Sequence, residues 1–523
     1  MRRQLWLWAI AAAAIVGAAS WLFLESRVRA TYESMLPTRP DFEGRPVHLR
    51  DHLTRLDAAA RDDPGNAKVV GVLARAYHAN DYSAEAVACY ELAMVLEPGE
   101  WKHPYGRALV LAEAGRPALT ADAFEAVIRV REESPFAWYW LAETRFKLAE
   151  YDAAEKAYLR ALEIGRARPT LGAAGLHRFP LAAHAAMGLA RVDEVRGDAR
   201  GGIGRIVEVA KRHPRFGSVH RLLAALYDSV GETDLAKEHL AQASRSRKFL
   251  PPADPYVREL TRESRSAAFL MKRAELARLA EDHEWAESLA RRALEMEPAE
   301  TEAAINLGRV LGDQGRSDEA LAILADYHQR FPDDMEVDAD FSLCAQVMSD
   351  GLVRSGRARD AELLFESLIR RFPETLWLHG LLGDVLVRTG RNEEAMPHLE
   401  KALEGGEDAD TRTNLGTVRA YLKDRAGAIA EFEKVLERTP EYVRAIENLT
   451  MAYLEEERFE DAERLTARFI GFAEESPAAH LLRARYLYGA EDMEGAKASL
   501  RRVIELDPAH ELAKNLLADL EKE

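Results

Sequence analysis

The sequence predicts an all-α protein built as a solenoid of about twelve repeated helix–turn–helix units, preceded by one transmembrane helix. Three observations support this fold class. One stretch carries two amphipathic stripes, its spacing recurs almost to the C-terminus, and the N-terminus holds an uncharged apolar run. Units of a solenoid bury their apolar faces against their neighbours, so the length of 523 residues sets no number of domains.

The stretch from Ala67 to Pro98 shows the repeated pattern most clearly. Apolar residues in its first half fall at i, i+3, i+4 and i+7, the spacing of one helix face, and a second stripe follows Asp81. Small side chains at Ala74 and Ala86 let the two helices approach closely. Larger side chains fill the space between them, namely Leu73, Tyr77 and Tyr90. Pro98 ends the second helix.

The same order of large, small, aromatic and proline positions recurs along the chain. A clear copy contains Trp138, Leu141, Ala142 and Tyr158, and a later one contains Leu307, Gly308, Gly315 and Pro332. This order resembles the tetratricopeptide repeat (TPR), whose period is about 34 residues. The resemblance implies a right-handed superhelical solenoid. It also implies a concave groove, lined by the first helix of each pair, that binds peptides or partner proteins.

Lapses of the pattern divide the chain. A proline-rich stretch after the fifth unit indicates an internal boundary, and prolines and glycines at 166–181 indicate a loop between repeats. The predicted segments are a signal anchor or transmembrane helix (1–30), a stalk with an N-terminal capping helix (31–66), a first block of repeats (67–250), an inter-block linker (251–266), a second block (267–510) and a C-terminal capping helix (511–523).

The N-terminus reads as a membrane anchor. Arg2 and Arg3 precede an apolar run, and residues 5–24 are long enough to span a bilayer as a helix. The run continues past a possible signal-peptidase site at Gly17, which favours an uncleaved anchor over a cleaved signal peptide. The paired arginines favour an N-in orientation, although Arg27 and Arg29 partly balance them. We expect a single-pass protein of the inner (cytoplasmic) membrane with a periplasmic array.

Composition excludes some functions and offers no catalytic motif. A net charge of −17 argues against nonspecific nucleic-acid binding. The sequence contains no GxSxG, HExxH, P-loop, CxxC or GxGxxG pattern, so we predict no enzyme and no cofactor. His48 and His52 share a helix face but lack a third metal ligand, and we therefore predict no metal. Cys89 and Cys344 are far apart in sequence and read as buried small side chains.

Residues that line the predicted groove are located by the stripe at i, i+3, i+7 and i+10 that avoids the packing face. In the first repeat this stripe is basic, and in the third it contains three aromatic rings. The candidates are Lys68, Arg75 and His78 in the first repeat, Phe136, Tyr139, Glu143 and Phe146 in the third, and Arg309, Trp377, Asp384, Arg444, Glu447 and Met451 later.

The aromatic cluster of the third repeat is the candidate hot spot for a partner. Exposed rings there would make Tyr139→Ala weaken partner capture with little change in stability. The alternative is that the loop at 166–181 folds over these rings and buries them. Asn306, Asn414 and Asn448 occupy equivalent positions that grip a peptide carboxylate in some TPR relatives, but the basic residues that complete this clamp are not in place here.

These features predict a membrane-tethered scaffold that binds peptide segments or partner proteins in the groove. The architecture also resembles that of bacterial envelope proteins that organise assembly machinery. An alternative is an accessory subunit that binds a glycan or lipid intermediate for a membrane synthase or export complex. A continuous platform of exposed aromatic rings would favour a glycan, whereas mixed charge with isolated aromatic pockets favours a peptide.

Overall fold

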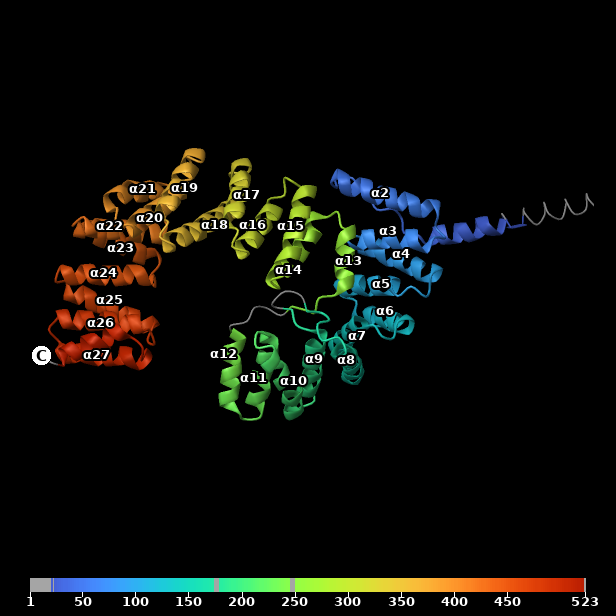
Figure 1. Ribbon diagram of the computed structural model, residues 1–523, viewed down its shortest axis with the longest axis horizontal. Helices are drawn as coiled ribbons and strands as arrows, with labels where there is room; N and C mark the ends of the chain where they lie inside the picture. Colours follow the sequence, from blue (N-terminus) through green and yellow to red (C-terminus); the bar gives the residue numbers. More distant parts are fainter. Residues whose placement is uncertain (1–19, 22, 174–177, 245–249, 522–523) are drawn as a thin grey trace, which may run out of the picture. The chain divides into compact units, whose positions relative to one another are not determined.

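The computed structural model describes residues 20–521, except 22, 174–177 and 245–249 (Figure 1). Within these residues the regular structure is helical and contains no strand, which confirms the all-α prediction. After α2 (Val47–Asp62), helices follow one another as twelve consecutive helix–turn–helix units, interrupted once by α13 (Pro255–Glu263). A last helix, α28 (Glu511–Leu520), packs on α27.

The units before α13 are α3 (Ala67–His78) with α4 (Ser83–Leu96), α5 (Lys102–Glu113) with α6 (Pro117–Val130), α7 (Pro135–Lys147) with α8 (Tyr151–Arg166), α9 (Leu181–Val195) with α10 (Ala199–Arg212), and α11 (Gly217–Ser229) with α12 (Thr233–Ser244). Those after it are α14 (Ala267–Leu279) with α15 (His283–Met296), α16 (Thr301–Asp313) with α17 (Ser317–Arg330), α18 (Met335–Arg354) with α19 (Ala358–Arg371), α20 (Trp377–Arg388) with α21 (Asn392–Glu404), α22 (Ala409–Tyr421) with α23 (Arg425–Arg438), α24 (Val443–Glu455) with α25 (Phe459–Phe472), and α26 (Pro477–Gly489) with α27 (Met493–Leu506).

The chain forms two compact units, residues 1–316 and 317–523. Their boundary lies in the turn between α16 and α17, whereas the sequence indicated a boundary at 251–266. Residues 255–263 of that predicted linker form α13, which packs against α3 inside the first unit. A lapse of the repeat pattern therefore does not mark the edge of a compact unit in this chain.

The first repeat shows how local sequence builds a unit. The side chain of Asn66 caps α3 by accepting hydrogen bonds from the backbone N–H groups of Lys68 and Val69. Asp81 adopts a positive φ of 66°, which turns the chain sharply between the two helices. Tyr77 and Tyr90 are completely buried, and the Tyr90 ring packs on Gly106 of the next unit.

Close packing between helices requires small residues at defined places. A Cβ atom added at Gly188 in α9 would lie 2.3 Å from Cε1 of Tyr158 in α8. That distance is far below van der Waals contact, so the Tyr158 ring packs directly on the backbone of the next helix. The large and small residues of the repeat pattern thus give adjacent helices complementary packing surfaces.

The segment 31–46 is not the stalk that its prolines predicted. Leu36 and Phe42 are buried and belong to the core of the first repeat. The guanidinium of Arg61 donates to the carbonyl of Pro37 at 2.7 Å, and the Phe42 ring meets Tyr82 edge-on. Leu36 and Phe42 gain more by burial on the repeat than by exposure to water, so the segment packs as part of the first unit.

No helix among the described residues is long and apolar enough to cross a membrane. Most of the predicted anchor at 5–24 lies outside these residues.

The described residues contain no group of three or more His, Cys, Asp or Glu side chains that could hold a metal ion. Nε2 of His48 instead lies 3.1 Å from the Arg265 carbonyl oxygen, and both cysteines are free thiols.

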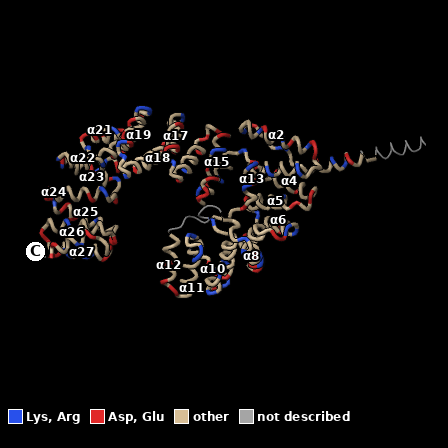
Figure 2. The backbone as a smooth tube through the Cα atoms, in the orientation of Figure 1, with Lys and Arg blue, Asp and Glu red and all other residues tan. Residues whose placement is uncertain are grey.

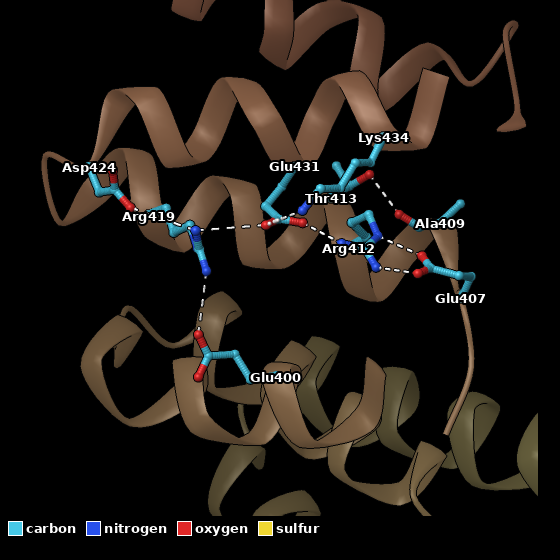
Figure 3. Close-up of polar contacts among 9 residues, drawn as sticks. All are labelled: Glu400, Glu407, Ala409, Arg412, Thr413, Arg419, Asp424, Glu431 and Lys434. Atoms are coloured by element: carbon cyan, nitrogen blue, oxygen red, sulfur yellow. Dashed lines mark hydrogen bonds and ion pairs between the residues drawn. The ribbon is translucent and has the colours of Figure 1, made fainter. Parts of the chain in front are cut away.

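A buried ion-pair cluster joins α22 and α23 (Figure 3). The carboxylate of Glu431 is 4% exposed and accepts hydrogen bonds from Arg412 and from Lys434, the latter at 3.1 Å. Arg412 also donates to both oxygens of Glu407, at 2.5 and 2.7 Å. Arg419 lies 3.7 Å from Glu431. Helices α22 and α23 are therefore held together by ion pairs as well as by apolar packing.

Candidate functional site

The first three repeats hold a segment of their own chain. Residues 250–266, here called the docked segment, comprise a proline-containing stretch, the α13 helix and three further residues. Helix α13 packs against α3 (Figure 1). Asp254 accepts hydrogen bonds from side chains of α5 and α7, and Asn80, in the turn after α3, donates to the carbonyl of Glu263. Helices α3, α5 and α7 are the first helices of three consecutive repeats. We call this surface of α3, α5 and α7 the first-repeat face. It corresponds to the groove side expected from the sequence.

Asp254 is the polar anchor of the docked segment. Its carboxylate is buried and accepts hydrogen bonds from the Tyr105 hydroxyl on α5 and from the Trp140 indole on α7, the latter at 3.2 Å. The same carboxylate caps α13 by accepting from the backbone N–H of Tyr256 at 2.9 Å. None of these three donors carries a charge. Burial raises the pKa of Asp254, and these hydrogen bonds oppose the rise.

Two further side chains of the docked segment supply apolar contact. Tyr256 is buried against the rings of Trp101 and Tyr105, with centroid distances of 6.2 and 5.1 Å, and its hydroxyl lies 3.3 Å from that of Tyr90. Leu260, one helical turn further on, is completely buried. Aromatic pairs at such distances contribute beyond their buried area.

Both edges of the docked segment are also bound. Lys102 of α5 pairs with Glu259 at 2.8 Å. The side-chain oxygen of Asn80 accepts from the backbone N–H of Arg265 at 2.7 Å. At the opposite end, the backbone N–H of Ala253 donates to a carbonyl in the 166–181 loop, that of Gly172, at 2.7 Å.

The basic stripe predicted on the first repeat is only partly available. Lys68 is exposed, but His78 is buried and its Nε2 lies 3.3 Å from Glu113, which also pairs with Arg273 of α14. Nε of Arg75 is buried and makes no hydrogen bond to any described residue. The charge of Arg75 acts on the hydroxyl of Tyr256, so this guanidinium belongs to the site that the docked segment fills.

The aromatic cluster predicted on the third repeat is not an exposed surface. Phe136 and Tyr139 are 6% and 1% exposed. Tyr139 packs against Tyr158 of α8 and His184 of α9, so these helices cover its ring. Leu171 and Phe179 of the 166–181 loop pack against the same core cluster. First helices of adjacent repeats touch along part of the stripe that the spacing assigned to the groove. The prediction of exposed hot-spot rings here was wrong.

The other two residues of that stripe serve the same junction. Glu143 accepts hydrogen bonds from Tyr158 at 2.5 Å and from Arg191 at 3.2 Å. The guanidinium of Arg191 also lies over the Phe146 ring, 4.1 Å from its centroid. These contacts join α7, α8 and α9, and they leave little of the third-repeat stripe for a partner.

In the second unit, first helices α18, α20, α22, α24 and α26 contact one another in sequence and form what we call the second-unit face. A polar ladder crosses it. Asn414 donates to Asp384 at 3.0 Å and accepts from Arg444 at 2.7 Å. The ladder consists, in order, of Asp350, Arg388, Asp384, Asn414, Arg444 and Asp410.

The remaining predicted residues divide between the two units. Trp377 is half-buried, donates its indole N–H to Asp338 at 2.9 Å and meets Phe341 edge-on. Met451 accepts a weak hydrogen bond from Arg485 at 3.8 Å. Glu447 is half-buried on α24. Arg309 is exposed on α16, in the first unit. The predicted residues therefore lie on first helices, but the spacing alone could not show which of their side chains bond to one another.

The docked segment itself was missed as a functional element. Its signal in the sequence is Asp254 followed by a proline, a helix cap pattern at the start of a short helix within the non-repeat stretch.

Outside this segment, acidic and basic residues are interspersed along the helices (Figure 2).

The fold and its face of first helices define an α-helical repeat protein. Models of the tetratricopeptide repeat match residues 105–170 and 348–410, residues 277–346 and 421–486, and residues 477–510, which together exceed half of the chain. The chain therefore belongs to the tetratricopeptide repeat family. No curated protein matches the sequence.

Solved structures match this chain at low identity and with TM-scores below 0.5. The APC/C Cut9–Hcn1 hetero-tetramer matches at 14% identity and a TM-score of 0.35, covering 92% of this chain and 97% of that one. YrrB, described as a TPR protein with an unusual peptide-binding site, matches at 20% and 0.27, covering 43% and 96%. A TPR protein from Cytophaga hutchinsonii matches at 17% and 0.34, covering 47% and 98%.

Proposed function

We propose that this protein is a non-catalytic interaction scaffold that holds segments of partner proteins on the faces formed by its first helices. One observation carries this proposal: the first-repeat face already binds a peptide segment, through the buried carboxylate of Asp254 and the rings around Tyr256. A surface that holds a helix-forming segment of its own chain has the chemistry needed to hold one from another protein.

The second-unit face is the surface that we propose for partner binding. Arg444 and Asp410 pair at 2.5 Å, yet their side chains remain 49% and 58% exposed, so both charges stay within reach of a partner. Alternating charges suit a peptide of mixed charge. A glycan would need a run of exposed rings, whereas Trp377 is engaged edge-on with Phe341. This arrangement favours a peptide ligand.

We further propose that residues 5–24 tether the scaffold to the inner membrane, with the repeats in the periplasm and a role in envelope assembly. The apolar run and the N-terminal arginines support this placement. Protease treatment of intact spheroplasts tests it. Digestion of the repeats is expected, and complete protection would contradict the periplasmic placement.

Affinity capture from detergent-solubilised membranes tests the scaffold function. We expect Arg444→Glu to reduce the amount of captured partner about tenfold or more. The substitution replaces a positive charge on the polar ladder with a negative one, which would repel the group of the partner that Arg444 attracts. Arg464→Glu is the matched control, since its side chain is 79% exposed on α25, a second helix. Equal losses in the two variants, or no specific partner with the wild type, would refute the proposal.

A further inference from the structure

We propose that the first-repeat face is a receptor for partner segments that carry a carboxylate capping a short helix, a tyrosine two residues later and an aliphatic side chain four residues after that. The docked segment, with Asp254, Tyr256 and Leu260, is its resident and exchangeable occupant. This inference rests on the proposed scaffold function and deepens it at a different surface.

The contacts are of the kind that recognise a ligand. Asp254 accepts hydrogen bonds from Tyr105 of α5, 149 residues away in sequence, and from Trp140 of α7, 114 residues away. The hydroxyl of Tyr256 lies beside that of Tyr90 in α4, 166 residues away. These contacts therefore owe nothing to local chain geometry. Tyr256 and Leu260 are four residues apart and share one face of α13, whose start is capped by Asp254. A helical peptide presents its anchors to a surface in this way.

The docked segment leaves part of the receptor unused. The Asp254 carboxylate is buried with uncharged donors only, while the Arg75 guanidinium has a buried Nε–H without an acceptor among the described residues. A carboxylate on a partner segment that reached Arg75 would form a charge-assisted hydrogen bond that the resident segment lacks. The preferred partner is therefore more acidic than the docked segment near the position of Tyr256.

Covalent attachment favours the resident. A tethered segment competes at an effective concentration in the millimolar range, so a free peptide of the same sequence gains access only when the resident is weakened or the peptide binds more tightly. Asp254→Ala removes the acceptor shared by Tyr105 and Trp140. Loss of a hydrogen bond to a charged group shifts an equilibrium about tenfold to a hundredfold, which should open the face to a competitor.

The test uses the full chain and a fluorescent peptide that corresponds to residues 250–266, followed by anisotropy. Asp254→Ala is expected to bind the peptide at least about tenfold more tightly than the wild type. Arg262→Ala is the control within the docked segment, because its side chain is exposed, and it should bind as the wild type does. A peptide that carries Asp254→Ala should lose at least about tenfold in affinity for the opened chain.

Equal peptide binding by wild type and Asp254→Ala would overturn the proposal, as would indifference to the aspartate of the peptide. Hydrogen exchange of the wild type gives a second test that needs no variant. The amides of α13 should exchange through a local opening while α3 and α5 stay protected. Exchange of all three helices in one step would show a fixed structural element and refute exchangeability. Neither result depends on capture by the second-unit face, so the two proposals fail separately.

Discussion

Replacement of Glu431 by alanine should destabilise the pair α22–α23 strongly. Glu431 is buried and receives hydrogen bonds from Arg412 and Lys434 (Figure 3). Its removal leaves the Arg412 guanidinium, whose side chain is 11% exposed, with Glu407 as its remaining partner in this cluster. An uncompensated charge in a buried site is the main cause of the expected loss.

The size of the stability loss depends on the partners that Arg412, Lys434 and Arg419 keep in the variant. Removal of one partner from a buried ion pair costs about 3–5 kcal/mol. The bidentate contact of Arg412 with Glu407 persists in the variant and offsets part of that cost. Lys434 is 53% exposed, so water replaces most of the interaction that it loses, and Arg419 keeps Glu400 and Asp424 as partners. We therefore expect a loss of about 2–3 kcal/mol.

Two variants sharpen the measurement. Glu400→Ala removes a half-exposed carboxylate that lies 3.5 Å from Arg419, and it should cost no more than about 0.5 kcal/mol. The double variant Arg412→Met with Glu431→Leu removes both buried charges and should recover most of the stability. Because a repeat array need not unfold in one step, native-state hydrogen exchange of α22 and α23 is the assay. Equal effects of Glu431→Ala and Glu400→Ala would refute this reasoning.

Three further outcomes are expected. Tyr139→Ala should cost about 3–5 kcal/mol in urea unfolding, since the ring is buried, and a change below about 1 kcal/mol would contradict that burial. Gly188→Ala should cost about 1–3 kcal/mol because its Cβ would overlap Tyr158. Nδ1 atoms of His379 and His398 lie 2.8 Å apart, and burial lowers both pKa values below 6.5. The unfolded chain then binds more protons, so the contribution of this pair to stability should be constant above about pH 6.5 and fall below it. His398→Gln should reduce the fall of the melting temperature below pH 6.5 relative to the wild type.

The helix pairs could be predicted because their signal is local. Leu73, Tyr77 and Tyr90 recur at helical spacing, and all three are completely buried. The candidate site could be predicted only in outline. The stripe named Asp384 and Arg444 as groove residues, but it could not show that each bonds to Asn414.

The amino-acid sequence by itself determined the class of fold and the number of helix pairs, because these depend on residues three to twenty positions apart. Only the tertiary structure decided what covers each face. It put Asp254 on Tyr105, buried Tyr139 under α9 and folded Phe42 onto the first repeat. These contacts join residues that are far apart in the sequence, and such contacts produce no periodic pattern of residues from which they could be predicted.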